Sequence, residues 1–344
     1  MSIGIARENL KAGFVFVYFY LGFFLGASLL YPFPAVSQTQ NSPTVSSPQK
    51  IPATTILTGY QGSIESLIFS PDSLTLISGG GNSDPRIQTW SVVGGEALSQ
   101  LGAQNSGILT LAITPNGQTL ISSGEDADIH FWDWQNQVSQ TTFFEHQTKV
   151  LALAVTPDSQ MVVSASLDGI RVWQVSPPSL LYQLSKFGDS GYALAIHPNG
   201  YLLASGGDRG QVKIWNLRNG KLVSEFTAHR EPVTGLAWTS DGESLITASF
   251  DGNIKIWEVK SGHLRTTLSG HNSRINALAL SPSSRILASS SRDGVRLWQV
   301  STGESAGFFQ NQPTIINTLT FSPNGQWLAG GGLDGTIYLW PATK

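Results

Sequence analysis

The sequence predicts an all-β protein, a seven-bladed β-propeller preceded by an N-terminal hydrophobic helix. Three observations lead to this fold class. Tryptophan ends an apolar segment seven times, at intervals of 41 or 42 residues. Each interval contains the same order of short apolar runs and turns. The chain also has 36 glycines and only 12% charged residues among its 344 positions, as expected for many short strands joined by tight turns.

The tryptophans mark the third strand of each repeat. They end segments such as RIQTW, NIKIW and TIYLW, whose apolar residues fit a buried β-strand. The regular spacing indicates seven copies of one structural unit. The seven residues are Trp90, Trp132, Trp173, Trp215, Trp257, Trp298 and Trp340.

Each repeat reads as four short strands. An alternating stretch such as VTGLAW comes first, followed by a turn such as TSDG and a second strand such as SLITA. A short turn containing aspartate leads to the strand that ends in tryptophan, and a weaker fourth strand such as KLVSEF follows the preceding repeat's tryptophan. Four strands in about 40–45 residues are typical of one propeller blade.

The last blade requires a strand from elsewhere in the chain. Only residues 341–344 follow the last tryptophan, which is too few for an outermost strand. An unpaired sheet edge and an unsealed ring would be unstable. We therefore expect residues 53–59, ATTILTG, to pair into the last blade, so that the propeller extends over residues 53–344.

The N-terminal segment has the character of an export signal. Residues 13–31 carry no charge and follow Arg7 and Lys11, so they are long enough to span a bilayer with the basic side in the cytoplasm. Prolines and small residues come next, so residues 1–37 are expected to be either a cleaved signal peptide or a retained signal anchor. Residues 38–52, rich in Gln, Ser and Pro, are expected to be a flexible linker. The propeller is then extracytoplasmic, on the periplasmic or lumenal side.

The repeats resemble those of the WD40-repeat family over about residues 53–344. In that family, well-formed repeats carry a hydrogen-bonded tetrad of His, Ser or Thr, Asp and Trp, which gives the buried indole N–H the partner it needs. The resemblance implies three such tetrads here. They are His271, Ser289, Asp293 and Trp298; His229, Thr247, Asp251 and Trp257; and His146, Ser164, Asp168 and Trp173.

The other four repeats depart from the tetrad pattern. Tyr60 stands where the first blade would have histidine, and Ala103, Phe187 and Asn311 fall near that place in three other blades. Arg209 occupies the aligned aspartate position of the fourth blade. We expect incomplete tetrads in these blades and an intact fold, because the fold depends on apolar burial.

Nothing in the sequence indicates chemistry. With no cysteine, disulfides, thiolate catalysis and thiolate zinc sites are excluded. The histidines do not pair at metal-ligand spacing, and an aspartate recurs once per blade, as a structural turn residue would. A net charge of −3 without a basic block makes nucleic acid an unexpected partner. We expect no catalytic residue, metal or cofactor, and no enzyme activity.

The resemblance implies a docking face that bears the loops before each first strand and the aspartate turns. Arg and aromatic residues, which dominate interface energies, occur there. The expected partner-binding residues are Lys149, Leu167, Tyr192, Arg209, Arg230, Phe250, Arg274, Arg292 and Leu333. We expect a monomeric scaffold for protein partners, exported or membrane-anchored, as an accessory or assembly factor for a membrane or envelope complex. The alternative is an exported propeller that binds or processes a small ligand, glycan or peptide.

Overall fold

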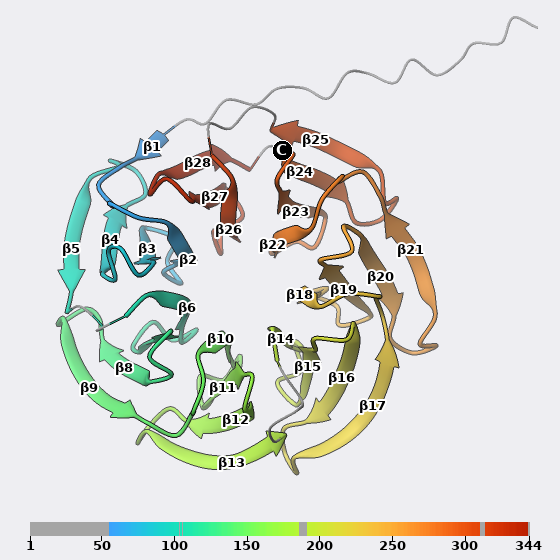
Figure 1. Ribbon diagram of the computed structural model, residues 1–344, viewed down its shortest axis with the longest axis horizontal. Helices are drawn as coiled ribbons and strands as arrows, with labels where there is room; N and C mark the ends of the chain where they lie inside the picture. The colour runs from blue at the N-terminus through green and yellow to red at the C-terminus, as the bar shows by residue number, and fades with distance from the viewer. Residues whose placement is uncertain (1–54, 103, 105, 186–190, 310–313, 343–344) are drawn as a thin grey trace, which may run out of the picture. The chain divides into compact units, whose positions relative to one another are not determined.

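A computed structural model describes residues 55–342 of the chain, apart from 103, 105, 186–190 and 310–313. These described residues form 28 strands in seven four-stranded sheets, which are arranged in a ring (Figure 1), and they contain no helix. The predicted seven-bladed all-β propeller is therefore confirmed. The expected hydrophobic helix at 13–31, the signal or anchor at 1–37 and the linker at 38–52 lie outside the described residues. Within the part of the chain that the structure describes, no helix could span a membrane.

Each blade is numbered by the order of its innermost strand along the chain. Blade 1 contains β2 (Ile64–Phe69), β3 (Thr75–Gly80), β4 (Ile87–Ser91) and β5 (Ala97–Leu101), and blade 2 contains β6 (Ile108–Ile113), β7 (Leu120–Gly124), β8 (Ile129–Asp133) and β9 (Val138–Phe143). Blade 3 contains β10 (Val150–Val155), β11 (Met161–Ser166), β12 (Gly169–Gln174) and β13 (Ser179–Ser185), and blade 4 contains β14 (Ala193–Ile196), β15 (Leu202–Gly206), β16 (Gln211–Asn216) and β17 (Lys221–Thr227). Blade 5 contains β18 (Val233–Trp238), β19 (Ser244–Ser249), β20 (Ile254–Glu258) and β21 (Leu264–Leu268), and blade 6 contains β22 (Ile275–Leu280), β23 (Ile286–Ser291), β24 (Gly294–Gln299) and β25 (Ser305–Phe309). Blade 7 contains β26 (Ile316–Phe321), β27 (Trp327–Gly332), β28 (Ile337–Pro341) and β1 (Thr55–Leu57).

Every blade is an antiparallel sheet. Within a blade, the strands are arranged in sequence order from the centre of the ring to its outer edge, and the exception is β1, which lies at the outer edge of blade 7 (Figure 1). Antiparallel pairing places the turns between second and third strands at the same end of the blade as the connections that enter the next innermost strand. We call the face formed by these turns and connections the aspartate-turn face. The remaining turns form the opposite face.

Strand β1 joins the two ends of the described chain. It pairs antiparallel with β28, with Thr55 opposite Leu339 and Leu57 opposite Ile337. Of the segment 53–59 that was expected to pair into the last blade, the structure describes a strand at Thr55–Leu57, while residues 53 and 54 lie outside the described part. Leu57 is 2% exposed and packs in a cluster that contains both blade 7 and blade 1 side chains.

The hydrophobic core is divided into clusters that lie between neighbouring blades. Between blades 1 and 2, for example, Ile77 of β3 packs with Ile108, Leu120 and Trp132 of the next sheet. The blades approach so closely that a Cβ on Gly79 would lie 2.6 Å from the Ile108 side chain. Each blade therefore buries one sheet face against the next blade, and an isolated blade could not bury it.

Candidate functional site

Blade 6 contains a complete hydrogen-bonded tetrad beneath the aspartate-turn face. The His271 imidazole contacts Asp293 through Nδ1 at 2.6 Å and the Ser289 hydroxyl through Nε2 at 2.8 Å. The Trp298 indole donates to the same hydroxyl at 2.8 Å. A neutral imidazole with its proton on Nδ1 satisfies every member, because it donates to the carboxylate and accepts from the hydroxyl.

Blades 3 and 5 repeat this arrangement. The imidazole–carboxylate, imidazole–hydroxyl and indole–hydroxyl distances are 2.6, 2.7 and 2.8 Å in blade 3. They are 3.0, 2.7 and 3.1 Å in blade 5. As in blade 6, the structure thus joins the residues that the sequence resemblance implied. The blade 3 set is His146, Ser164, Asp168 and Trp173, and the blade 5 set is His229, Thr247, Asp251 and Trp257.

The tetrads have perturbed acid–base properties. Burial lowers the pKa of His146, His229 and His271, and their carboxylate partners offset this only in part. For Asp168, burial favours the protonated form, but the backbone N–H of Gln147 and the bonds from His146 and Arg171 outweigh it and lower the pKa to about 2. The tetrads are therefore most stable with neutral imidazoles and ionised carboxylates.

We expect acid to destabilise the propeller in two stages. Below the ordinary histidine pKa of about 6.5, the unfolded chain binds protons that the buried imidazoles resist, so the free energy of unfolding falls with pH. A second fall follows below the ordinary aspartate pKa, as the pH approaches the lowered folded pKa of Asp168. Urea unfolding across this pH range measures both stages. His271→Gln should reduce the fall in the free energy of unfolding in the first stage, and the control His263→Gln, at an exposed histidine, should not. A constant free energy of unfolding between neutral and mildly acidic pH would contradict the expectation.

Blade 1 substitutes a phenol for the imidazole. The Tyr60 hydroxyl lies 2.9 Å from the Ser78 Oγ, to which the Trp90 indole donates at 2.8 Å. Burial raises the pKa of Tyr60, so the phenol stays neutral. This blade keeps a hydrogen-bonded chain without a titrating histidine.

Blades 2 and 7 show what happens when the pattern fails. In blade 7, Gly330 replaces the hydroxyl residue, and the Trp340 indole N–H has no partner among the described residues. A Cβ at Gly330 would lie 2.7 Å from that indole ring, so the ring fills the space that a serine side chain needs. In blade 2, Gln104 precedes Ser122 by the same 18 residues that separate His146 and Ser164. It is 4% exposed with an unpartnered side-chain amide, whereas Ala103, which the sequence placed near this point, is not described.

A ring of bulged residues lines the mouth of the central channel. In six blades the pairing of the innermost strand with the second strand skips one residue, and the skipped side chain turns toward the channel axis. Tyr192 takes the corresponding place in blade 4. All seven line a cavity of about 490 Å³: Glu65, Leu109, Leu151, Tyr192, Thr234, Asn276 and Asn317.

The channel mouth has an apolar half and a polar half. Leu109, Leu151 and Tyr192 of blades 2 to 4 face the amides of Asn276 and Asn317 across the cavity. Phe250 of blade 5 and Arg274 of blade 6 also line the cavity. The guanidinium carbon of Arg274 lies 5.4 Å from the centroid of the Phe250 ring, within the range of a cation–π contact.

The structure brings together only some of the expected partner-binding residues. Tyr192, Phe250 and Arg274 meet at the channel mouth. Lys149, Arg230, Arg292 and Leu333 are exposed on the same face without lining this cavity, and Leu167 is partly buried. Arg209 lines a different cavity.

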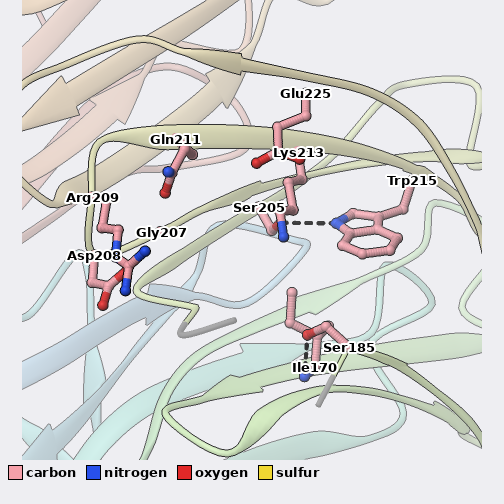
Figure 2. Close-up of a pocket in the computed structure, with 10 residues that line it drawn as sticks. All are labelled: Ile170, Ser185, Ser205, Gly207, Asp208, Arg209, Gln211, Lys213, Trp215 and Glu225. Atoms are coloured by element: carbon pink, nitrogen blue, oxygen red, sulfur yellow. Dashed lines mark hydrogen bonds between the residues drawn. The ribbon is translucent and has the colours of Figure 1, made fainter. Parts of the chain in front are cut away.

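This second cavity, of about 200 Å³, lies between blades 3 and 4 (Figure 2). Figure 2 shows Asp208 and Arg209 at one end and Trp215 at the other, where its indole donates to Ser205 at 2.8 Å. Lys213 lies opposite Glu225 in the register of β16 and β17. The cavity opens where blade 4 has no aspartate at the tetrad position, with Arg209 in its place.

One group of potential metal ligands was not predicted from the sequence. Among the described residues, side-chain atoms of Asp126, Asp128 and His130 lie within 4.8 Å of one another. Nδ1 of His130 contacts the Thr142 hydroxyl at 3.0 Å, and Nε2 lies 3.9 Å from Asp126. These are ligand types that could hold a divalent cation. The sequence signal is the alternate spacing Asp-x-Asp-x-His, which the spacing of the histidines alone does not reveal.

Comparison with known proteins follows the repeat pattern. The family model described as "WD domain, G-beta repeat" matches residues 52–91, 95–133, 220–258, 262–299 and 303–341. The model described as "Anaphase-promoting complex subunit 4 WD40 domain" matches residues 144–234. The two models leave little of the ring unmatched.

Three curated relatives illustrate the extent of similarity. Apoptotic protease-activating factor 1 from Rattus norvegicus is 25% identical over 47% of this chain and 13% of its own length. WD repeat-containing protein WDS homolog from Arabidopsis thaliana is 26% identical over 47% of this chain and 31% of its own length. Periodic tryptophan protein 2 from Arabidopsis thaliana is 33% identical over 23% of this chain and 8% of its own length. The matched region thus spans less than a third of each relative.

Proposed function

Because the chain belongs to the WD40-repeat family, whose propellers generally bind protein partners, we propose that it is a non-catalytic scaffold that docks proteins at the channel mouth. The observation that carries this proposal is the convergence of Tyr192, Phe250 and Arg274 from three successive blades. Aromatic and arginine side chains contribute most to protein interfaces. The rigid ring holds them in place, so little ordering entropy is lost when a partner binds.

The setting of this scaffold is also a proposal. The uncharged segment 13–31, after two basic residues, supports export of the propeller to the extracytoplasmic side, as a secreted or anchored protein. There it would serve as an accessory or assembly factor of a membrane or envelope complex. The relatives are longer proteins of several kinds, so they leave the partner to be found by experiment.

A small-ligand function has weaker support. The cavity between blades 3 and 4, at about 200 Å³, is smaller than the pockets of about 300–1,000 Å³ that hold most small ligands. The channel mouth is larger but wide, and it offers a surface on which a protein segment could lie. A protein partner therefore fits the geometry better.

Affinity capture from solubilised membranes, quantified by mass spectrometry, tests the scaffold proposal. The full chain is compared with Arg274→Glu and with the control Arg218→Glu, which changes an exposed arginine on the opposite face. We expect a set of proteins that the wild type and Arg218→Glu retain and Arg274→Glu loses. An empty set, or one that Arg274→Glu retains unchanged, would refute docking at this mouth. N-terminal sequencing in the same preparation tests export, since a mature chain beginning at Gln38 indicates signal cleavage.

A further inference from the structure

The cations on one side of the aspartate-turn face are neutralised by the protein itself. On blades 1 to 3, each of three basic side chains that reach this face forms an ion pair with a nearby carboxylate. The pairs are Arg86 with Asp84 at 3.2 Å, Lys149 with Glu125 at 3.6 Å and Arg171 with Asp168 at 3.0 Å. This side of the face therefore presents no uncompensated positive charge from these residues.

The cations on blades 4 to 6 are different. Arg209, Arg230, Arg274 and Arg292 are all exposed, and none of their side chains forms an ion pair with a described residue. The tetrad carboxylates of these blades are already occupied: Asp251 bonds His229, and Asp293 bonds both His271 and Arg296. Among the described residues, no ion pair joins Arg209 to its neighbour Asp208 or Arg230 to its neighbour Glu231. Four guanidinium groups are thus available to an external anion.

Arg274 also has a partner that fixes its position. Its guanidinium carbon lies 5.4 Å from the centroid of the Phe250 ring, which is 39% exposed at the channel mouth. A guanidinium in a cation–π contact can still donate its N–H groups to a carboxylate. The site therefore combines an anion-binding group with the exposed ring of Phe250 and the partly exposed ring of Tyr192.

We infer that blades 4 to 6 bind an acidic peptide segment of the partner, with its carboxylates on the four arginines and an apolar side chain against Phe250 and Tyr192. This inference rests on the proposed scaffold function and names the chemistry of the partner. Charge complementarity of this kind sets specificity and association rate. A long uniform polyanion fits less well, because the opposite half of the face bears the carboxylates Glu65, Glu125, Asp126, Asp128 and Glu145.

The test uses the full-length protein and three fluorescein-labelled peptides of equal length. All contain two phenylalanines in the same places. They differ only at one shared set of other positions, which carry glutamate in the first peptide, glutamine in the second and lysine in the third. Fluorescence anisotropy at physiological salt should rank their affinities glutamate, then glutamine, then lysine. Arg274→Gln should weaken binding of the glutamate peptide about tenfold. Arg230→Gln and Arg292→Gln should each weaken it about threefold.

Lys149→Gln is the matched control, because Lys149 lies on the same face and is already paired with Glu125. It should leave the affinity unchanged. Equal binding of the glutamate and glutamine peptides overturns the inference, and so does an equal loss in Lys149→Gln and Arg274→Gln. Tighter, Arg274-dependent binding to phosphatidylserine vesicles than to the glutamate peptide also overturns it, in favour of a lipid surface. If proteins are captured in an Arg274-dependent way but the glutamate peptide is not preferred, the acidic chemistry is refuted and the scaffold proposal stands. If the glutamate peptide is preferred but no protein is captured in an Arg274-dependent way, the scaffold proposal alone is refuted.

Discussion

Replacing Leu57 with aspartate is expected to lower the free energy of unfolding by about 4 kcal/mol or more. Leu57 is 2% exposed and lies in β1, the strand that pairs with β28. The substitution removes an apolar side chain from the cluster between blades 7 and 1 and places a carboxylate there without a partner. Because β1 is held by few residues, the chain can relieve this cost by releasing β1, which leaves the edge of β28 unpaired.

Urea unfolding measures the loss, and the neighbouring residue supplies the control. Ile56 belongs to the same strand but points outward and is 57% exposed, so Ile56→Asp should change stability by less than about 1 kcal/mol. Limited proteolysis should cut the chain near β1 sooner in Leu57→Asp than in Ile56→Asp. Equal stability of the two variants would show that β1 does not close the ring energetically.

The sequence was sufficient for the ring and for its three complete tetrads because both depend on spacing along the chain. Histidine precedes its hydroxyl partner by 18 residues and its aspartate by 22 in each of these blades, as with His146, Ser164 and Asp168. The same count leads to Gln104 in blade 2, whereas the residue chosen by sequence was Ala103. The spacing is therefore intact in blade 2, but glutamine in place of histidine leaves no recognisable letter at this position.

The channel mouth could not be predicted in the same way. Its lining depends on a β-bulge, and the bulged positions carry chemically unrelated residues, from Glu65 and Leu109 to Thr234 and Asn276. A backbone irregularity that accepts any side chain leaves no repeated letter in the sequence. The contact between Arg274 and Phe250 joins two blades and is likewise visible only in three dimensions. Sequence resemblance predicted these residues on the aspartate-turn face, and the structure shows which of them meet there.

Asp168→Ala should be the most damaging substitution among the aspartate turns, with a loss of about 3–5 kcal/mol in the free energy of unfolding. The carboxylate of Asp168 accepts the Gln147 backbone N–H at 3.0 Å, contacts His146 at 2.6 Å and pairs with Arg171 at 3.0 Å. The Arg171 side chain is only 11% exposed, so alanine leaves a largely buried guanidinium without its counter-ion.

The control is the equivalent aspartate of blade 7. Asp334 is exposed, and its side chain accepts a hydrogen bond from the Thr336 backbone N–H at 3.0 Å, so Asp334→Ala should cost about 1 kcal/mol or less. Asp168→Asn separates charge from shape, because an amide oxygen can still accept the Gln147 N–H but cannot neutralise Arg171. If the asparagine variant is as stable as the wild type, the ion pair contributes nothing and geometry alone holds the turn. If it loses nearly as much as alanine, the charge on Asp168 is what holds this turn of blade 3 through Arg171.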